Sequence, residues 1–346
     1  MPILIETELK AKIKSGNVTG LYLIYGSENY LKFHYVEQLR KQAVAPDFEA
    51  FNFHSFEGKE TSLDEIHEAA EAVPLMSPSS CVLVKDFPLE SLDDIQTGKF
   101  TELVSDVSPS CALIFLRTAE EPPPKKKGWN SIYALCKQYG AVVELNQKGA
   151  ADLRRVVTAG VKKRGCALEP AVADYFIACV GTDLNLLLNE TDKLCAYAPN
   201  RTITRTDIDR IITKSLEANA FDITKALLSG RPDKALSLLD ILLAQKAEPL
   251  MLLGAVNSSF IDMYRVRVAT AAGKTADYIA ELFAYRSAYR LRYAAKDAAG
   301  IPLERLRACL ELLHKADERL KSSSSAKRLV LEQTFVELSL TCRRPS

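Results

Sequence analysis

Five short runs of apolar and β-branched residues recur through the first 145 residues, and stretches with helical periodicity lie between most of them. The runs are LYLIYG (21–26), AFNFHSF (50–56), CVLVKD (81–86), CALIFLRT (111–118) and AVVEL (141–145). One helical stretch opens with the capping-box sequence Ser62-Leu63-Asp64-Glu65. Strands that alternate with helices form βαβ units, whose parallel sheet is covered by helices on both faces. The sequence therefore predicts an α/β domain over residues 1–145.

Helical periodicity dominates after residue 145, where the strand signal fades. Three helical stretches end at Gly165, Gly181 and Pro199, and a fourth opens at Thr204, whose hydroxyl can cap a helix N-terminus. We expect a small helical domain over residues 146–215.

Helical patterns also fill residues 216–346, where Pro232 and Pro249 each open an expected helix. Two further helices are expected over 303–320 and 326–340. No fixed-period repeat indicates a solenoid. The predicted fold is therefore α/β followed by all-α, with a parallel-sheet domain, a small helical domain and a C-terminal helical domain.

The composition is that of an ordinary globular protein, with 47% hydrophobic and 26% charged residues and a net charge of +1 among 346 residues. No global basic field indicates strong autonomous binding to nucleic acid. The first residues, MPILIETELKAKI, lack the basic and apolar regions of a signal peptide, and no apolar run reaches the roughly 18 residues of a membrane span. We expect a cytoplasmic protein without membrane contact.

The eight cysteines are scattered, with no C-x-x-C pair, and the four histidines share no motif. Reduced cysteines, no metal site and no bound cofactor are expected.

The junction after the first expected strand reads Gly26-Ser27-Glu28 and leads into a helix. In a nucleotide-binding P-loop this junction carries G-x-x-x-x-G-K-[ST], whose backbone N–H groups and lysine bind the phosphates. Here the second glycine and the Lys-Ser/Thr pair are missing, and Glu28 would repel a phosphate. We interpret these three residues as a degenerate P-loop.

The order of the three domains resembles that of an AAA+ clamp-loader subunit, with a sheet domain, a helical lid and a helical collar through which subunits oligomerise. That resemblance implies an acidic pair for Mg²⁺ after the third strand and a polar sensor after the fourth. The third run instead ends with the single acid Asp86, and the fourth ends at Arg117-Thr118.

Four segments resemble one family closely, the delta subunit of the bacterial DNA polymerase III clamp loader. They are LYLIYGSENYLK, AVPLMSPSSCVLVKDF, GTDLNLLLNETDKLCAY and FDITKALLSGRPDKALSLLDILLAQKAEPLMLLGAVNSSF. The resemblance implies an AAA+ framework that does not hydrolyse ATP. It also implies a subunit that binds and opens the sliding clamp (beta), beside gamma/tau and delta-prime subunits and primed DNA, within the polymerase III holoenzyme.

The resemblance assigns clamp binding to Pro74, Leu75 and Met76, where the family carries a Leu-Phe pair that enters a hydrophobic pocket on the clamp. Pro74 disfavours helix in the residue before it, so the two apolar side chains would stand on a loop before the third strand. Methionine keeps most of the volume of phenylalanine but loses its aromatic packing. In the alternative interpretation, Leu75 and Met76 only cap the core.

Two basic segments are candidates for DNA contact. Lys125, Lys126 and Lys127 follow a proline run, and Arg286, Arg290 and Arg292 alternate with tyrosines along an expected helix. The alternatives are a solvated loop and a helix that packs its tyrosines inward.

Two other functions remain open at this point. A standalone nucleic-acid-binding scaffold is disfavoured by the nearly neutral net charge, and an active AAA+ ATPase is disfavoured by the degenerate P-loop and the single Asp86.

Overall fold

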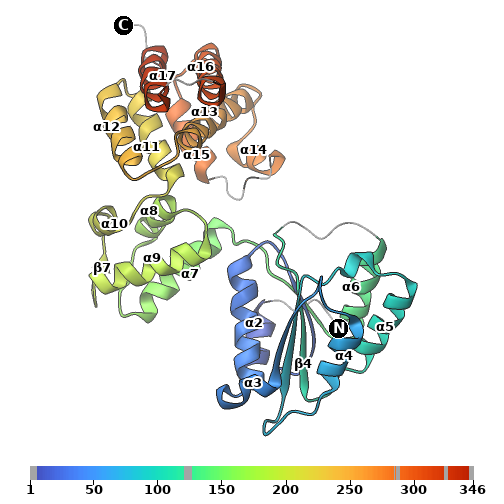
Figure 1. Ribbon diagram of the computed structural model, residues 1–346. Helices are drawn as coiled ribbons and strands as arrows, with labels where there is room; N and C mark the ends of the chain where they lie inside the picture. The colour runs from blue at the N-terminus through green and yellow to red at the C-terminus, as the bar shows by residue number, and fades with distance from the viewer. Residues whose placement is uncertain (1–5, 121–126, 284, 286–288, 323–325, 343–346) are drawn as a thin grey trace. The chain divides into compact units, whose positions relative to one another are not determined.

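The computed structural model describes residues 6–120, 127–283, 285, 289–322 and 326–342 (Figure 1). The chain divides into two compact units, Met1–Lys148 and Gly149–Ser346. The domain boundaries expected from the sequence stay predictions.

The first unit is built on a five-stranded parallel sheet in the order β2-β3-β4-β1-β5. The strands are β1 (Gly20–Tyr25), β2 (Phe53–Glu57), β3 (Ser80–Lys85), β4 (Cys111–Leu116) and β5 (Ala141–Glu144). Each of the five predicted runs contains a strand, and the α/β class is confirmed. The run at 50–56 was partly wrong, because its first three residues belong to the helix over Glu49–Asn52. Because every strand is parallel, the sheet has one carboxyl edge and one amino edge, and loops from different parts of the chain meet at each.

Helices cover both faces of this sheet (Figure 1). The helices are α1 (Glu6–Ser15), α2 (Asn29–Ala43), α3 (Glu49–Asn52), α4 (Leu63–Glu71), α5 (Asp94–Ser105) and α6 (Lys127–Tyr139), with 3-10 turns η1 (Pro46–Phe48) and η2 (Leu89–Ser91). Helices α4, α5 and α6 share a core with Leu21, Leu23 and alternate residues of the other central strands. Since strand side chains alternate between faces, Tyr22 and Ile24 point to the opposite face, where α2 lies.

The second unit begins with four helices and a minimal sheet. The helices are α7 (Ala150–Lys163), α8 (Pro170–Val180), α9 (Leu184–Tyr197) and α10 (Arg205–Ile211), and the strands β6 (Ala167–Leu168) and β7 (Thr202–Ile203) pair in parallel. The purely helical expectation for residues 146–215 was wrong in this detail, because a two-residue strand has no periodicity to recognise. The expected cap at Thr204 is confirmed, since its hydroxyl accepts from the backbone N–H of Asp207 in a capping box.

The rest of the second unit is helical throughout the described residues. Its helices are α11 (Leu216–Leu228), α12 (Pro232–Ala244), α13 (Pro249–Ala271), α14 (Ala276–Leu282), α15 (Tyr289–Ala298), α16 (Leu303–Ser322) and α17 (Lys327–Cys342). Pro232 and Pro249 open helices as predicted. Phe260 of α13, Leu313 of α16 and Phe335 of α17 lie in the shared core.

All eight cysteines lie in the described ranges, and each is buried with no disulfide. No helix in the described part of the chain combines the length and apolar character needed to cross a bilayer.

Candidate functional site

The turn after β1 packs against the segment that follows β5. Gly26 has a φ of +128°, and a Cβ atom built on it would lie 2.2 Å from the carbonyl oxygen of Leu145. The backbone N–H of Glu28 donates to that same oxygen at 2.9 Å, and the N–H of Ser27 donates to Asn146 Oδ1 at 3.2 Å. The glycine is therefore required by the contact between two loops of this chain.

The N-terminus of α2 is capped by a carboxylate of the chain itself. Glu28 is the N-cap residue, and its Oε1 accepts from the backbone N–H of Tyr30 at 3.2 Å. The Glu28 side chain is buried. A helix N-terminus attracts anions through its N–H groups and dipole, and P-loops use it for phosphate. Here Glu28 supplies the negative charge.

Lys32 of α2 is fully buried and forms three hydrogen bonds to the chain segment after β4. Its ammonium group donates to the carbonyl oxygens of Arg117, Thr118 and Ala119 at 2.9, 2.9 and 3.1 Å. Burial lowers the pKa of Lys32 from its ordinary value, and the nearby Asp86 carboxylate opposes that shift. The ammonium charge is therefore satisfied by carbonyl oxygens within the unit.

Lys32 follows Gly26 by six residues, which is the interval between the first glycine and the lysine of a P-loop. The expectation that the whole Lys-Ser/Thr pair is missing was therefore wrong for the lysine, whose spacing is kept. Leu31 replaces the second glycine and Phe33 replaces the Ser/Thr. The lysine position is thus kept, but its side chain now ties α2 to the end of β4.

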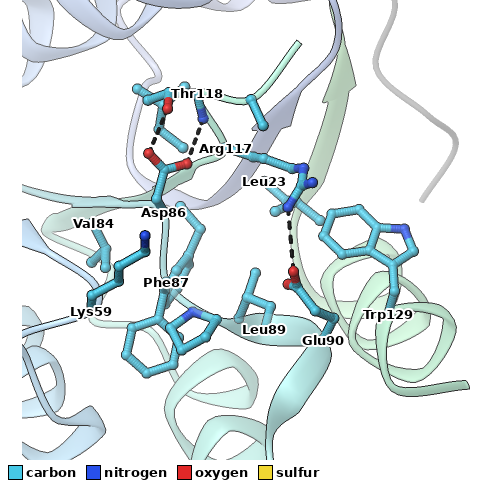
Figure 2. Close-up of a pocket in the computed structure, with 14 residues that line it drawn as sticks. Leu23, Lys59, Val84, Asp86, Phe87, Leu89, Glu90, Arg117, Thr118 and Trp129 are labelled. Atoms are coloured by element: carbon cyan, nitrogen blue, oxygen red, sulfur yellow. Dashed lines mark hydrogen bonds and ion pairs between the residues drawn. The ribbon is translucent and has the colours of Figure 1, made fainter. Parts of the chain in front are cut away.

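Asp86 also bonds to its own chain at the carboxyl edge (Figure 2). The residue directly follows β3 with a φ of +49°. Its Oδ1 accepts from the backbone N–H of Thr118 at 2.7 Å, and its Oδ2 accepts from the Thr118 hydroxyl. The acid expected at the Mg²⁺ position and the polar residue expected at the sensor position therefore bond to each other. Across the described ranges, no group of three or more His, Cys, Asp or Glu side chains could hold a metal ion.

An AAA+ framework implies bound ATP and Mg²⁺, and the residues at this edge do not fit them. Glu28 places negative charge where phosphate would bind, Lys32 is surrounded by carbonyl oxygens, and Asp86 bonds to Thr118. Each group that would contact nucleotide has a partner within the chain.

A cavity of about 320 Å³ lies at the same edge, on the face covered by α4, α5 and α6. Figure 2 shows Leu23, Val84 and Trp129 among its apolar walls. Arg117 Nη1 lies 3.6 Å from a carboxylate oxygen of Glu90, and its guanidinium lies 6.0 Å from the centre of the Trp129 ring. The cavity is thus apolar inside, with an ion pair at its wall.

The opposite, amino edge of the sheet presents apolar side chains to solvent. The loop between α4 and β3, residues 72–79, carries Val73, Leu75 and Met76, whose exposed fractions are 89%, 51% and 78%. Pro74 lies between the first two. Leu75 and Met76 are therefore exposed, and the alternative in which they only cap the core does not describe their position.

A buried side chain from another segment fixes the backbone of this loop. Asn52, at the end of α3, is 1% exposed. Its Oδ1 accepts from the N–H of Leu75 at 2.7 Å, and its Nδ2 donates to the carbonyl oxygen of Leu75 at 2.9 Å. Further along, the Ser79 hydroxyl donates to the carbonyl oxygen of Ala43 at 2.6 Å. Asn52 was not among the predicted site residues, because nothing in its local sequence pattern indicates a partner 23 residues away.

Four of the six candidate DNA-contact side chains lie outside the described part of the structure. Lys125, Lys126 and Arg286 lie outside the described residues, and of Lys127 only its place at the start of α6 is described. Their role stays a prediction.

The other two candidates, Arg290 and Arg292, form ion pairs within the second unit. Arg290 pairs with Asp262, which is buried and also accepts from the Tyr285 hydroxyl. Arg292 Nη2 lies 2.8 Å from an oxygen of Asp277. This geometry favours the alternative in which the helix packs against its neighbours.

Two family models match the chain and together cover well over half of it. The model described as DNA polymerase III, delta subunit, matches residues 22–146, and the one described as DNA polymerase III delta subunit, C-terminal domain, matches residues 217–338.

Two curated relatives carry the same description. The DNA polymerase III subunit delta of Bacillus subtilis (strain 168) is 24% identical over 334 residues, which are 94% of this chain and 94% of the relative. The probable DNA polymerase III subunit delta of Aquifex aeolicus (strain VF5) is 26% identical over 131 residues, 37% of each chain.

The fold is also similar to that of a solved clamp-loader protein along most of the chain. The Bacillus subtilis DNA clamp loader delta protein (YqeN) superposes with a TM-score of 0.67 at 22% identity, over 96% of this chain and 99% of that one. This likeness supports the predicted fold class along nearly the whole chain. Both family models describe this subunit, and four segments of the sequence resemble the same family. The chain therefore belongs to the family of DNA polymerase III delta subunits.

Proposed function

We propose that this chain binds and opens the sliding clamp within a replicative clamp loader, and that it does not itself hydrolyse ATP. The observation that carries the proposal is the exposed loop at the amino edge. Leu75 and Met76 protrude from a loop whose backbone is held by Asn52. Large apolar side chains exposed on a fixed loop are typical of a site that anchors a protein partner.

The size of the exposed side chains suits a hydrophobic pocket on the clamp. Fully burying a Leu or Met side chain contributes roughly 1.5–3 kcal/mol. Because Asn52 already orders the loop backbone, less conformational entropy is lost when the loop binds. Met76, which replaces the family's aromatic residue, can adapt its unbranched side chain to the pocket.

The proposed mechanism is differential binding. If Leu75 and Met76 bind the clamp more tightly when its interface is open, binding shifts the clamp toward that state by the difference in affinity. The gamma/tau and delta-prime subunits would complete the loader, and ATP-driven motion of the hydrolysing subunits would expose or withdraw the loop. Release of the clamp then requires no chemistry in this chain.

The bonding at the carboxyl edge supports the view that this subunit does not hydrolyse ATP. Glu28, Lys32 and Asp86 would each have to give up a partner within the chain before a nucleotide could bind. An active AAA+ ATPase would need these groups to be available.

Primed DNA is proposed as a partner only within the assembled loader. The net charge of +1 provides little electrostatic attraction for autonomous binding. Arg290 and Arg292 already pair with carboxylates, which disfavours a standalone nucleic-acid-binding scaffold. The lysines at 125–127 and Arg286 stay candidates for contact inside the complex.

The test is the affinity of the purified chain for its cognate clamp, compared with the double variant Leu75→Ala, Met76→Ala. Both side chains are largely exposed, so the variant should stay folded, and we expect about a hundredfold loss of affinity. Ile95→Ala is a matched control, because Ile95 is exposed on α5 and lies outside the loop. It should bind like the wild type.

A double variant that binds as tightly as the wild type would mean that the anchor is misplaced. A wild-type chain that does not bind the clamp would refute the proposal as a whole.

A further inference from the structure

The segment that leads into β2 lies beside the loop at residues 72–79. It consists of η1 and α3, and its last two residues, Phe51 and Asn52, differ sharply in exposure. Phe51 is 59% exposed, whereas Asn52 is fully enclosed. Both β2 and β3 begin at the amino edge, so two segments distant in the sequence meet there.

Asn52 pairs with Leu75 much as a neighbouring strand would. Its amide oxygen accepts from the Leu75 N–H, and its amide nitrogen donates to the Leu75 carbonyl oxygen and to that of Phe48 at 3.1 Å. An aspartate could keep only the first of these bonds, and an apolar residue could make none. Both backbone groups of Leu75 are thus satisfied without help from its side chain, which is left to face solvent.

The residue that follows Leu75 has a costly backbone conformation. Met76 has a φ of +51°, a region that side chains other than glycine, asparagine and aspartate rarely adopt. Such a conformation persists only where its surroundings enforce it. The bonds from Asn52 on one side, and those of Ser77 and Ser79 on the other, provide that constraint.

Phe51 extends the apolar surface of the loop. It is adjacent in the chain to the residue that holds Leu75, and it exposes a large aromatic ring that has no role in the core. Phe51 and the loop residues Val73, Leu75 and Met76 thus expose large apolar side chains on two segments that are joined by the bonds of Asn52.

We propose that Phe51 and Asn52 form the second part of the clamp-docking surface. Phe51 contacts the clamp directly beside Leu75 and Met76, and Asn52 is a positioning residue that acts through the loop. This inference rests on the proposed function and adds to it a contact and a positioning residue outside the loop. The partner is the same clamp, because Asn52, which follows Phe51 in the chain, bonds directly to the backbone of the proposed anchor residue Leu75.

The experiment measures clamp affinity for Phe51→Ala, Asn52→Ala and Asn52→Asp, each alone and combined with Leu75→Ala, Met76→Ala. Phe51→Ala should weaken binding about five- to tenfold. Phe33→Ala is its matched control, since Phe33 is similarly exposed on α2, and it should have no effect.

Asn52→Ala should weaken binding about tenfold in the wild-type background and less than about twofold when the anchors are already removed. This non-additivity separates positioning from a general loss of stability, which would act equally in both backgrounds. The clamp affinity of Asn52→Asp should lie between those of the wild type and Asn52→Ala, because aspartate keeps the bond from the Leu75 N–H. Hydrogen exchange at the Leu75 amide should accelerate in Asn52→Ala and stay slower in Asn52→Asp.

If Asn52→Ala does not fold, Phe51→Ala and Asn52→Asp still decide the matter. This inference alone would be overturned if the anchor variant loses clamp affinity while Phe51→Ala binds like the wild type. It would also be overturned if a change at Asn52 lowers clamp affinity equally with and without the anchor side chains. An anchor variant that binds like the wild type would mean that the anchor is misplaced, and this inference would fall with it. A wild-type chain that does not bind the clamp would overturn the proposed function as a whole.

Discussion

The loops at the two edges of the parallel sheet differ in where their side chains find contacts. At the carboxyl edge, the charged side chains of Glu28, Lys32 and Asp86 bond to the chain's own backbone. At the amino edge, Leu75 and Met76 expose apolar surface to solvent. The charged groups at the carboxyl edge thus have hydrogen-bond partners within the chain. The amino edge instead carries apolar surface that a partner could cover.

The difference shows how charged residues at the carboxyl edge of a parallel sheet can serve the fold itself. Lys32, at the position that a P-loop lysine would take, donates to the three carbonyl oxygens that follow β4, and Glu28 caps the N-terminus of α2. The residues that would hold a ligand therefore stabilise the fold. This account predicts that changes at the carboxyl edge cost stability, whereas changes at the amino edge cost binding.

The largest effect on stability is expected from Lys32→Met. The change leaves the carbonyl oxygens of Arg117, Thr118 and Ala119 without their donor, and we expect a loss of about 3–5 kcal/mol in the free energy of unfolding. Urea unfolding of the purified chain measures it. Lys59→Met, at the exposed rim of the cavity, is the matched control and should change stability by less than about 0.5 kcal/mol. Equal stability of the two variants would show that Lys32 has no structural role.

A smaller effect is expected from Gly26→Ala. A new Cβ would lie 2.2 Å from the Leu145 carbonyl oxygen at a φ that alanine avoids, so we expect a loss of about 2–4 kcal/mol in the free energy of unfolding. Gly98→Ala is the matched control, because Gly98 lies inside α5 and a Cβ there meets nothing within 4 Å. That change should stabilise the chain by about 0.5–1 kcal/mol, and thermal unfolding distinguishes the two signs. A tolerated Gly26→Ala would mean that the turn can move away from Leu145.

The sequence was sufficient to predict those strands and helix starts that are specified by a local pattern of residues. The apolar runs at 21–26 and 111–118 predicted buried parallel strands, and Ser62 and Thr204 predicted helix starts that the structure confirms. The exposed Leu75 and Met76 were also foreseen as residues on a loop before the third strand.

The features that escaped prediction depend on contacts between distant residues. The hydrogen bonds of Asn52 to Leu75 and of Lys32 to Arg117 join segments 23 and 85 residues apart. The spacing from Gly26 to Lys32 could have identified the lysine position, but not the carbonyl oxygens that surround it. The strands β6 and β7 are too short to leave a pattern at all.

The measurement that tests the central claim most directly is the affinity of the wild-type chain for its cognate clamp, with and without Mg²⁺ and ATP. We predict that the chain binds the clamp in both conditions with dissociation constants that agree within about twofold, because the proposed docking loop lies at the edge of the sheet opposite to Glu28, Lys32 and Asp86. Binding that requires ATP, or that changes tenfold or more when ATP is added, would contradict the account.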